Sequence, residues 1–178
     1  MATTAGLITL AEFERLPEQH NVRQELCHGE VVTTPPPGMP HFWAARRIRR
    51  VLERVLGDTW VVEREVPFRP LPEYEVWIAD VAVMGLDKTR AAQSSWLAGA
   101  PDLVVEVLSP SNTAVEMDER RAICLENGCR QFWVVNAERK IVNVSTPDAK
   151  AITYRKDEQI DLAEFGGGKL NLADIFGE

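Results

Sequence analysis

The sequence predicts a single domain of mixed α and β structure, an α/β or α+β fold, and three observations support this prediction. Apolar runs of strand length, rich in β-branched residues, recur between clear turn signals. Two stretches carry apolar residues at the spacing of amphipathic helices. One of these stretches lies between two buried-looking strands, an order typical of a parallel β-α-β unit. With 178 residues, 45% of them hydrophobic, the chain suits one domain, residues 1–178, with a substantial core.

Charge and cysteine content limit the functional classes. A net charge of −7 argues against nucleic-acid binding by the surface as a whole, since phosphates need a positive face, although a local basic patch stays possible. The chain has no run of apolar residues long enough to span a membrane, and its first residues do not resemble a secretory signal, so we predict a cytoplasmic protein. The cysteines lack zinc-site spacing and are expected to be free thiols: Cys27, Cys124 and Cys129.

The N-terminal half is predicted to contain two helices, a hairpin and a pair of strands. The capping-box residues Thr9 and Glu12 start the first helix, and His28 with Gly29 marks the hairpin turn. The predicted elements are a helix over residues 10–16, strands over 24–27 and 30–33, an amphipathic helix over 41–56, and strands over 60–68 and 74–84 that could pair in antiparallel fashion.

The C-terminal half is predicted to follow a strand-helix-strand order. Residues 87–100 give no firm prediction, and a good C-cap at Asn127 and Gly128 ends the helix. The predicted elements are a strand over residues 103–108, a helix from residue 112, a strand over 131–136 that pairs in parallel with the first, strands over 141–144 and 151–154, and a short closing helix over 170–176.

Two of the predicted strands each carry one acid among apolar residues, Asp80 in strand 74–84 and Glu106 in strand 103–108. A buried, unpaired carboxylate costs several kcal/mol, so a metal, a cation or a proton must neutralise it. If the strands are adjacent and in register, the two Cβ atoms lie about 5 Å apart and the carboxylates could share a divalent cation. Asp102 is a poorer partner for Glu106, because four residues along a strand span about 13 Å, and we interpret it as a strand entry.

The chemistry of this pair leaves two interpretations open. Hard carboxylate oxygens favour Mg²⁺ or Mn²⁺, which could polarise a phosphodiester, but arginines in a structural network could neutralise the acids equally well. Without a metal, Asp80 and Glu106 repel each other and lose water, so at least one should have a raised pKa. A divalent cation should then stabilise the protein more at pH 8 than at pH 5, and Asp80→Asn should stabilise the metal-free protein.

The helix over residues 41–56 holds the one basic concentration of this acidic chain. Five arginines lie on its polar faces, with only Glu53 to balance them: Arg46, Arg47, Arg49, Arg50 and Arg54. One interpretation is a solvated face that keeps the protein soluble, and the other is a patch that faces phosphates.

Several motifs resemble the Uma-two family of endonucleases, within the PD-(D/E)XK restriction-endonuclease-like superfamily. They are Gln24-Glu25-Leu26, Gly29-Glu30-Val31-Val32, His41 at the head of the long helix, Ala79-Asp80-Val81-Ala82-Val83, the stretch from Gly99 to Ser111, the helix ending at Gly128, and Gln131-Phe132-Trp133-Val134-Val135. The stretch Pro101-Asp-Leu-Val-Val-Glu-Val-Leu-Ser-Pro-Ser111 is the most specific of these, and the resemblance covers most of the chain.

The resemblance implies a restriction-endonuclease-like mixed β-sheet core flanked by helices, with an N-terminal hairpin. It implies Asp80, Glu106 and the Val107 carbonyl as ligands of Mg²⁺ or Mn²⁺, with Glu25 completing the site. Leu108 stands where the superfamily has its motif lysine. Arg120 stands where the family commonly has a lysine on the following helix, and it keeps the charge but cannot act as a general base. Cys124 and Ala79 also depart from the family's usual tyrosine and proline.

The leading hypothesis is therefore a Mg²⁺-dependent endonuclease acting on DNA. Its catalytic residues would be Glu25, Asp80, Glu106 and Arg120, and its nucleic-acid-binding residues His41, Arg46, Arg49 and Arg50. The alternative is a degenerate, noncatalytic nuclease fold used for binding or oligomerisation. A third hypothesis is that the arginine-rich helix binds nucleic acid without cleaving it. We also expect a homodimer, because tryptophans that look exposed exceed what one small domain needs: Trp43, Trp60 and Trp77.

Overall fold

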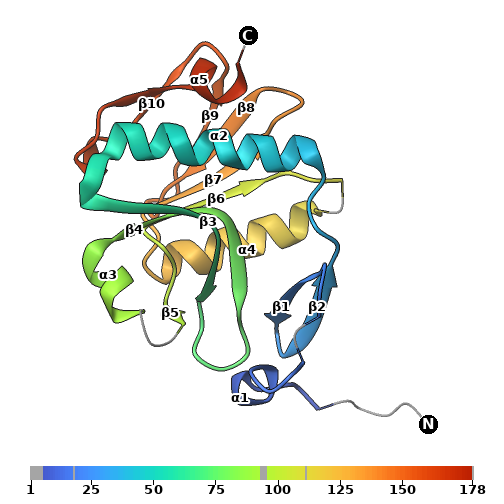
Figure 1. Cartoon of the computed structure of the whole chain (residues 1–178). Coiled ribbons are helices and arrows are strands. Elements are labelled where there is room, and N and C mark those ends of the chain that lie inside the picture. Colours follow the sequence, from blue (N-terminus) through green and yellow to red (C-terminus); the bar gives the residue numbers. More distant parts are fainter. Residues whose placement is uncertain (1–5, 18, 93–95, 111, 178) are drawn as a thin grey trace.

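The computed structural model describes residues 6–17, 19–92, 96–110 and 112–177, and its centre is a seven-stranded mixed sheet of order β5-β3-β4-β6-β7-β8-β9 (Figure 1). Two pairs are parallel, β3 with β5 and β6 with β7, and the others are antiparallel. The strands are β3 (Trp60–Arg69), β4 (Trp77–Gly85), β5 (Leu97–Ala98), β6 (Leu103–Val107), β7 (Gln131–Asn136), β8 (Ile141–Ser145) and β9 (Ala151–Arg155).

Helices cover both faces of this sheet. On one face lie α2 (Met39–Leu56) and α5 (Leu172–Phe176), and on the other lies α4 (Ala114–Glu126), as Figure 1 shows. Thr113 and Glu116 form a capping box at the start of α4. Shorter elements are α1 (Leu10–Phe13), α3 (Leu86–Ala91) and the 3₁₀ turns η1 (Gly57–Thr59) and η2 (Ala163–Phe165).

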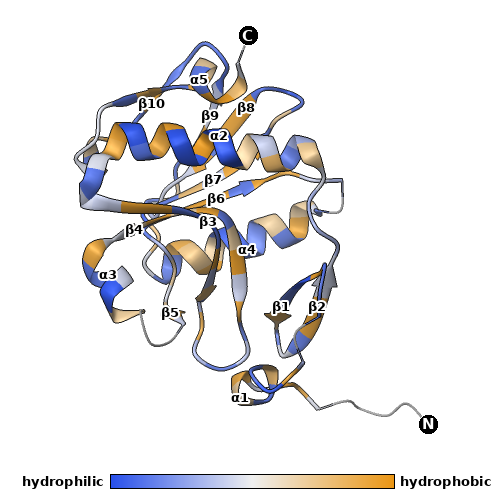
Figure 2. Cartoon of the chain, in the orientation of Figure 1, coloured by the Kyte–Doolittle hydropathy of each residue, from blue (hydrophilic) through white to orange (hydrophobic). Residues whose placement is uncertain are grey.

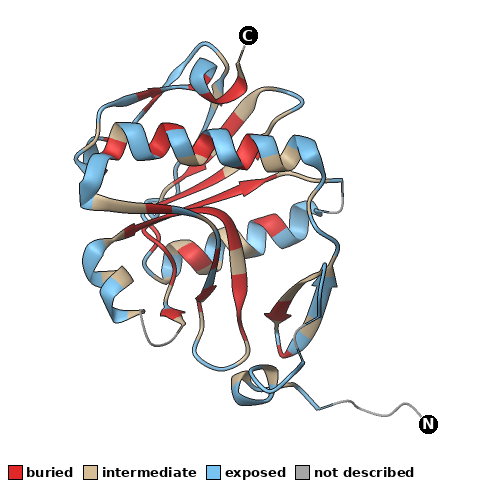
Figure 3. Ribbon diagram, in the orientation of Figure 1, coloured by how far each residue is buried: buried red, intermediate tan, exposed pale blue. Residues whose placement is uncertain are grey.

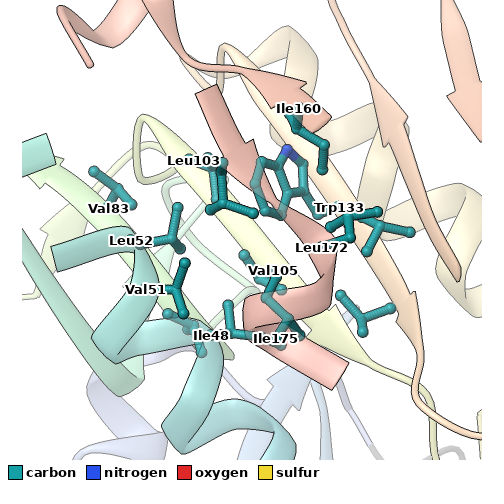
Figure 4. Close-up of a cluster of buried hydrophobic side chains, with 14 of the residues drawn as sticks. Ile48, Val51, Leu52, Val83, Leu103, Val105, Trp133, Ile160, Leu172 and Ile175 are labelled. Carbon is teal, nitrogen blue, oxygen red and sulfur yellow. The ribbon is translucent and has the colours of Figure 1, made fainter. Parts of the chain in front are cut away.

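The sheet separates two hydrophobic clusters, because alternate residues of β4 and β6 face opposite sides. The strands at the centre of the sheet are buried along almost their whole length, whereas α2 alternates between buried and exposed residues (Figure 3) and between apolar and polar residues (Figure 2). The larger cluster joins α2, α5 and the sheet, and Figure 4 shows among its members Ile48, Val51, Leu52, Leu103, Val105, Trp133, Leu172 and Ile175. The pair β4 and β6 thus forms the buried centre of the protein.

The N-terminal hairpin is a separate two-stranded sheet formed by β1 (Arg23–Cys27) and β2 (Glu30–Thr34). Its turn has φ values of 51° at His28 and 75° at Gly29, and a Cβ on Gly29 would lie 2.7 Å from Leu7 Cβ, so only glycine fits. Backbone hydrogen bonds between Leu26 and Val76 attach the hairpin just before β4. This attachment places β1 beside the start of β4.

Several predicted boundaries were wrong. The strand predicted over residues 74–84 begins only at Trp77, because Val76 pairs with the hairpin and Tyr74 belongs to a turn. The first helix ends at Phe13, and the closing helix starts at Leu172. The prediction missed β10 (Gln159–Asp161) and β11 (Lys169–Asn171), two three-residue strands that pair with each other and are too short to show a periodicity. Residues 87–100, without a firm prediction, contain most of α3 and all of β5.

The tryptophans do not form the exposed surface that we expected. Trp77 is 2% exposed and packs edge-on against Phe68, and Trp60 lies against Phe165, whose carbonyl accepts its indole N–H at 2.7 Å. Trp43 is 42% exposed. None of the helices that the structure describes is long and apolar enough to cross a membrane.

Candidate functional site

The two strand acids occupy adjacent positions on β4 and β6. Val81 pairs with Val105 at the end of the antiparallel β4–β6 ladder, and Asp80 and Glu106 are the residues that follow this pair on the two strands. Asp80 is 5% exposed and Glu106 is 6% exposed, so both carboxylates need partners inside the protein. On the other side of β4 the ladder skips Asp80 and Glu65, and Glu65 has a φ of 54°, a strained value for a residue with a side chain.

Asp80 is held by groups from three different elements. Its Oδ1 lies 2.9 Å from Arg23 Nη1 on the hairpin, and its Oδ2 lies 2.9 Å from His41 Nε2 at the head of α2. The backbone N–H of Val107 donates a further hydrogen bond of 2.8 Å to Oδ2. Burial alone would raise the pKa of Asp80, but the His41 hydrogen bond and the charge of Arg23 outweigh it, so the pKa is lowered from its usual value.

Glu25 enters the site from the hairpin. Its Oε1 accepts hydrogen bonds from Arg120 Nη2 at 2.8 Å and from the N–H of Ile78 at 2.7 Å. Arg23 and Glu25 are two residues apart on β1, so strand periodicity directs both toward β4. Arg23 also donates to the carbonyl of Ile78. The hairpin thus contributes one negatively charged and one positively charged side chain to the same cluster.

Glu106 is the acid with the least compensation. It forms an ion pair with Arg120, whose Nε lies 3.5 Å from Oε1, but among the residues that the structure describes this buried oxygen has no hydrogen-bond partner. Burial raises the pKa of Glu106 to about 8, and the nearby charge of Asp80 acts in the same direction. The expected raised pKa is therefore found on Glu106 and not on Asp80.

Arg120 links two of the three acids. It reaches the cluster from α4, and its guanidinium lies over the Trp77 ring at 4.9 Å from the ring centroid. Burial would lower the pKa of Arg120, but Glu106 and Glu25 outweigh burial and raise it, so the side chain is a permanent cation. Its pairing with Glu106 matches the structural-network interpretation of the acid pair.

The cluster has one formal negative charge in excess. It contains the carboxylates of Glu25, Asp80 and Glu106, against the guanidiniums of Arg23 and Arg120, with His41 counted as neutral. A proton on Glu106 or a bound cation would remove this excess. Glu106 Oε1 has the Arg120 guanidinium nearby but no hydrogen-bond partner among the described residues, so it is the atom where a proton or a cation would best fit.

Two side chains of the cluster carry oxygen atoms that suit a hard divalent cation. Asp80 and Glu106 have carboxylate oxygens, the ligands that Mg²⁺ and Mn²⁺ prefer, and no described residue forms a hydrogen bond with Glu106 Oε1. Both oxygens of Asp80 also accept hydrogen bonds from protein groups, so a cation would share them with Arg23, His41 and the Val107 N–H, and Oε1 of Glu25 is bound by Arg120. Within residues 6–17, 19–92, 96–110 and 112–177, no three His, Cys, Asp or Glu side chains converge to form a complete metal site.

A cleft of about 450 Å³ between the hairpin and α4 leads to the cluster. Glu25 and Arg120 form part of its wall, together with Trp77. The remaining charged residues of the wall are mainly acidic: Glu30, Glu116, Glu119 and His28. We call this cavity the acidic cleft.

The structure places the other predicted site residues as follows. His41 lies in the acid cluster and not on the basic face of α2. Arg46 and Arg50 are exposed on that face, whereas Arg49 is bound by acids on both sides. Leu108 lines a different cavity, of about 410 Å³, between α4 and strands β8 and β9.

Three of the remaining predictions concern single residues. Asp102 accepts a hydrogen bond from Gly85 N–H and pairs with Lys88 and Arg130, at the end of β6 away from Glu106, as a strand-entry residue would. Cys124 and Ala79 are buried in the cluster of apolar residues under α4. The sequence reasoning missed Arg23, although its period-two spacing from Glu25 is a signal that could have found it.

Comparison with known proteins decides the family. Residues 10–173 match the model of the Uma2 family, described as "Putative restriction endonuclease". The chain belongs to the Uma2 family. Its fold resembles the crystal structure of a protein from Anabaena variabilis described as "a putative nuclease belonging to DUF820", with a TM-score of 0.78, 22% sequence identity, and coverage of 95% of this chain and 97% of that chain. No curated protein matches this Uma2 chain.

Proposed function

We propose that this Uma2 protein is a Mg²⁺- or Mn²⁺-dependent endonuclease that hydrolyses phosphodiester bonds of DNA. The observation that carries the proposal is the pair of buried acids on β4 and β6, in which Glu106 Oε1 lies near Arg120 but has no hydrogen-bond partner within the part of the chain that the structure describes. A protein gains no stability from such an arrangement alone, since an uncompensated buried acid destabilises the fold. Such residues cluster at functional sites.

Each residue of the cluster has a role in this proposal. Asp80 and Glu106 would hold the divalent cation, with Val107 beside them, and the cation would polarise the phosphodiester and activate water. Arg23 and His41 orient Asp80 through hydrogen bonds. Glu25 fixes the guanidinium of Arg120, which would stabilise the negative charge that develops on the phosphoryl oxygens.

A cleavage assay tests this proposal. Plasmid and linear duplex DNA are incubated with Mg²⁺ or Mn²⁺ and the wild type, Asp80→Asn, or the charge-matched control Asp87→Asn, whose side chain is fully exposed. We expect metal-dependent cleavage that Asp87→Asn retains and that Asp80→Asn lowers by about 10³-fold, because loss of a ligand forfeits several kcal/mol of transition-state stabilisation. Cleavage that survives Asp80→Asn would contradict the assignment of the site.

The second candidate function is a noncatalytic nuclease fold used for binding or oligomerisation. The pairing of Arg120 with both Glu25 and Glu106 favours it, because a protein cation then occupies the position from which a metal ion would neutralise Glu106. Calorimetric titration with Mn²⁺ separates the two candidates. Binding that Glu106→Gln abolishes supports the enzyme, whereas no binding to the wild type supports the noncatalytic fold.

We also propose a homodimer, in which two-fold symmetry would present two clusters to one duplex. Of the tryptophans that led to this prediction, Trp43 remains exposed. Light scattering at tens of micromolar protein should give a dimer mass that Trp43→Ala reduces. A monomer mass for the wild type would remove this prediction.

A further inference from the structure

A second concave region, outside the acid cluster, lies between α2 and β3 and has a volume of about 520 Å³. We call it the arginine groove. Its wall contains four arginines, one aromatic ring and two acids: Phe42, Arg46, Arg49, Arg50, Arg64, Glu53 and Glu63. In a protein with a net charge of −7, this wall has a formal charge of +2.

The four arginines are not equivalent. Arg49 is held on both sides, with Nη2 3.3 Å from Glu53 Oε1 and 3.2 Å from Glu63 Oε1, and its Nε donates to the Val62 carbonyl at 3.1 Å. Its charge is therefore already balanced, and its contacts connect α2 to β3. Arg49 therefore has a structural role in the wall of the groove. The sequence had assigned it a different role, that of a nucleic-acid contact.

The other three arginines keep an uncompensated charge. Among the residues that the structure describes, none of Arg46, Arg50 and Arg64 has an ion-pair partner. Two of them rest on aromatic faces, Arg46 at 5.3 Å from the Trp43 centroid and Arg64 at 4.6 Å from the Phe42 centroid. An aromatic face positions a guanidinium without neutralising it, so its hydrogen-bond donors remain directed at solvent or a ligand. Planar, unpaired guanidiniums suit bidentate binding of phosphate oxygens.

The arginine groove begins next to the acid cluster. Phe42 follows His41, whose ring contacts Asp80, and Arg64 pairs across the β3–β4 ladder with Val81, the neighbour of Asp80. From His41, α2 then extends to Arg46 and Arg50. Nine residues of helix from His41 to Arg50 rise about 13 Å, which corresponds to roughly four nucleotides at 3.4 Å each.

We propose that the arginine groove binds the sugar-phosphate backbone of DNA through Arg46, Arg50 and Arg64, within about four nucleotides of the bond positioned at the acid cluster. This inference rests on the proposed endonuclease function. The acidic cleft on the other side of the cluster is unsuitable for the same task, because Glu30, Glu116 and Glu119 would repel phosphates. The proposal therefore places the DNA backbone along α2, where the wall is positive, and not between the hairpin and α4.

Salt-dependent binding of a fluorescent DNA duplex, measured in chelator so that no cleavage occurs, tests this inference. The variants are Arg46→Ala/Arg50→Ala and the charge-matched control Arg90→Ala/Arg139→Ala, whose side chains are exposed on α3 and on the turn after β7. Loss of two phosphate contacts should reduce the slope of log K against log salt by about 1.8. The affinity advantage of the wild type over the groove variant should then shrink about 12-fold between 50 and 200 mM salt.

The possible outcomes separate this inference from the proposed function. Three outcomes of the binding measurement overturn the inference. The groove variant could have the same salt slope as the wild type, or the control variant could show an equal reduction of this slope. The third is a wild type that does not bind DNA at 50 mM salt. Groove-dependent binding without cleavage in Mn²⁺ supports the groove and contradicts the endonuclease. Cleavage that is unchanged by Arg46→Ala/Arg50→Ala supports the endonuclease and contradicts the groove. Melting temperatures of both variants confirm that they are folded.

Discussion

The acidic cleft and the arginine groove have similar volumes, about 450 and 520 Å³, but they use charge in opposite ways. In the acid cluster at the base of the cleft, the three carboxylates are buried and the two arginines are largely covered, and hydrogen bonds or ion pairs hold these groups to one another. In the groove, Arg46 and Arg50 are exposed on the surface of α2. The comparison shows that buried charges couple function to stability, because each needs its partner, whereas exposed charges are available to a ligand at little cost to stability.

The largest expected effect is the loss of Arg120. Arg120→Ala leaves Glu25 and Glu106 buried without their shared cation, so the free energy of unfolding should fall by about 3–5 kcal/mol. Chemical denaturation above pH 8, where Glu106 is ionised in the wild type, measures this change. Arg120→Lys keeps the charge and should recover part of the loss. A decrease below about 1 kcal/mol for Arg120→Ala would mean that the buried acids do not depend on this cation.

Removal of the Glu106 charge should change how stability depends on pH. The folded pKa of about 8 lies above the unfolded value of about 4.3, so the folded protein binds more protons between these values and its stability falls as pH rises. Glu106→Gln removes the titrating carboxyl and with it this pH dependence. The variant should be more stable than the wild type at pH 8.5 by an amount on the order of a few kcal/mol. Glu126→Gln, at an exposed site on α4, serves as control. Parallel pH profiles for wild type and Glu106→Gln would contradict this prediction.

Divalent cations should stabilise the protein more at pH 8 than at pH 5. At pH 5 a proton occupies Glu106, and near pH 8 the metal ion can replace this proton. A metal-ion concentration of 100 times the Kd should then add about 2.7 kcal/mol to the free energy of unfolding. Thermal melting with Mn²⁺ at both pH values measures this difference. A melting temperature that ignores Mn²⁺ at both would mean that Arg23 and Arg120 already satisfy the acids.

Asp80→Asn is the matched variant for this measurement, and the structure reverses one expectation about it. It should abolish the metal dependence, but it should also destabilise the metal-free protein, because Arg23 and His41 would lose their charged partner. The sequence predicted stabilisation instead, because removal of the Asp80 charge would relieve its repulsion with Glu106. The lowered pKa of Asp80 shows that Arg23 and His41 outweigh this repulsion.

The smallest expected effect concerns the stability of the groove variant. Arg46→Ala/Arg50→Ala should change the free energy of unfolding by no more than about 0.5 kcal/mol, since both side chains are exposed and have no ion-pair partner among the described residues. Denaturation under the conditions used for Arg120→Ala allows a direct comparison. A loss similar to that of Arg120→Ala would show that the groove, like the acid cluster, is part of what holds the fold together.

The sequence by itself determined the features that follow from local patterns. The amphipathic period of α2, the glycine turn of the hairpin, the buried strands and the acids within them were all readable, because residues a few positions apart decide them. Adjacent acidic strands and the parallel β6–β7 pair follow from the order of these elements together with the chain's short connections. The resemblance of the sequence motifs to the family also predicted that the sheet is mixed.

Only the tertiary structure decided which charges meet. Arg23 reaches Asp80 across 57 residues and Arg120 reaches Glu25 across 95, and no local pattern specifies such contacts. The same holds on α2, where Arg49 and Arg50 are adjacent in the sequence, yet Glu63 on β3 neutralises only the first. A carboxylate's pKa and an arginine's availability depend on what lies within a few ångströms in space, and packing between distant segments sets those distances.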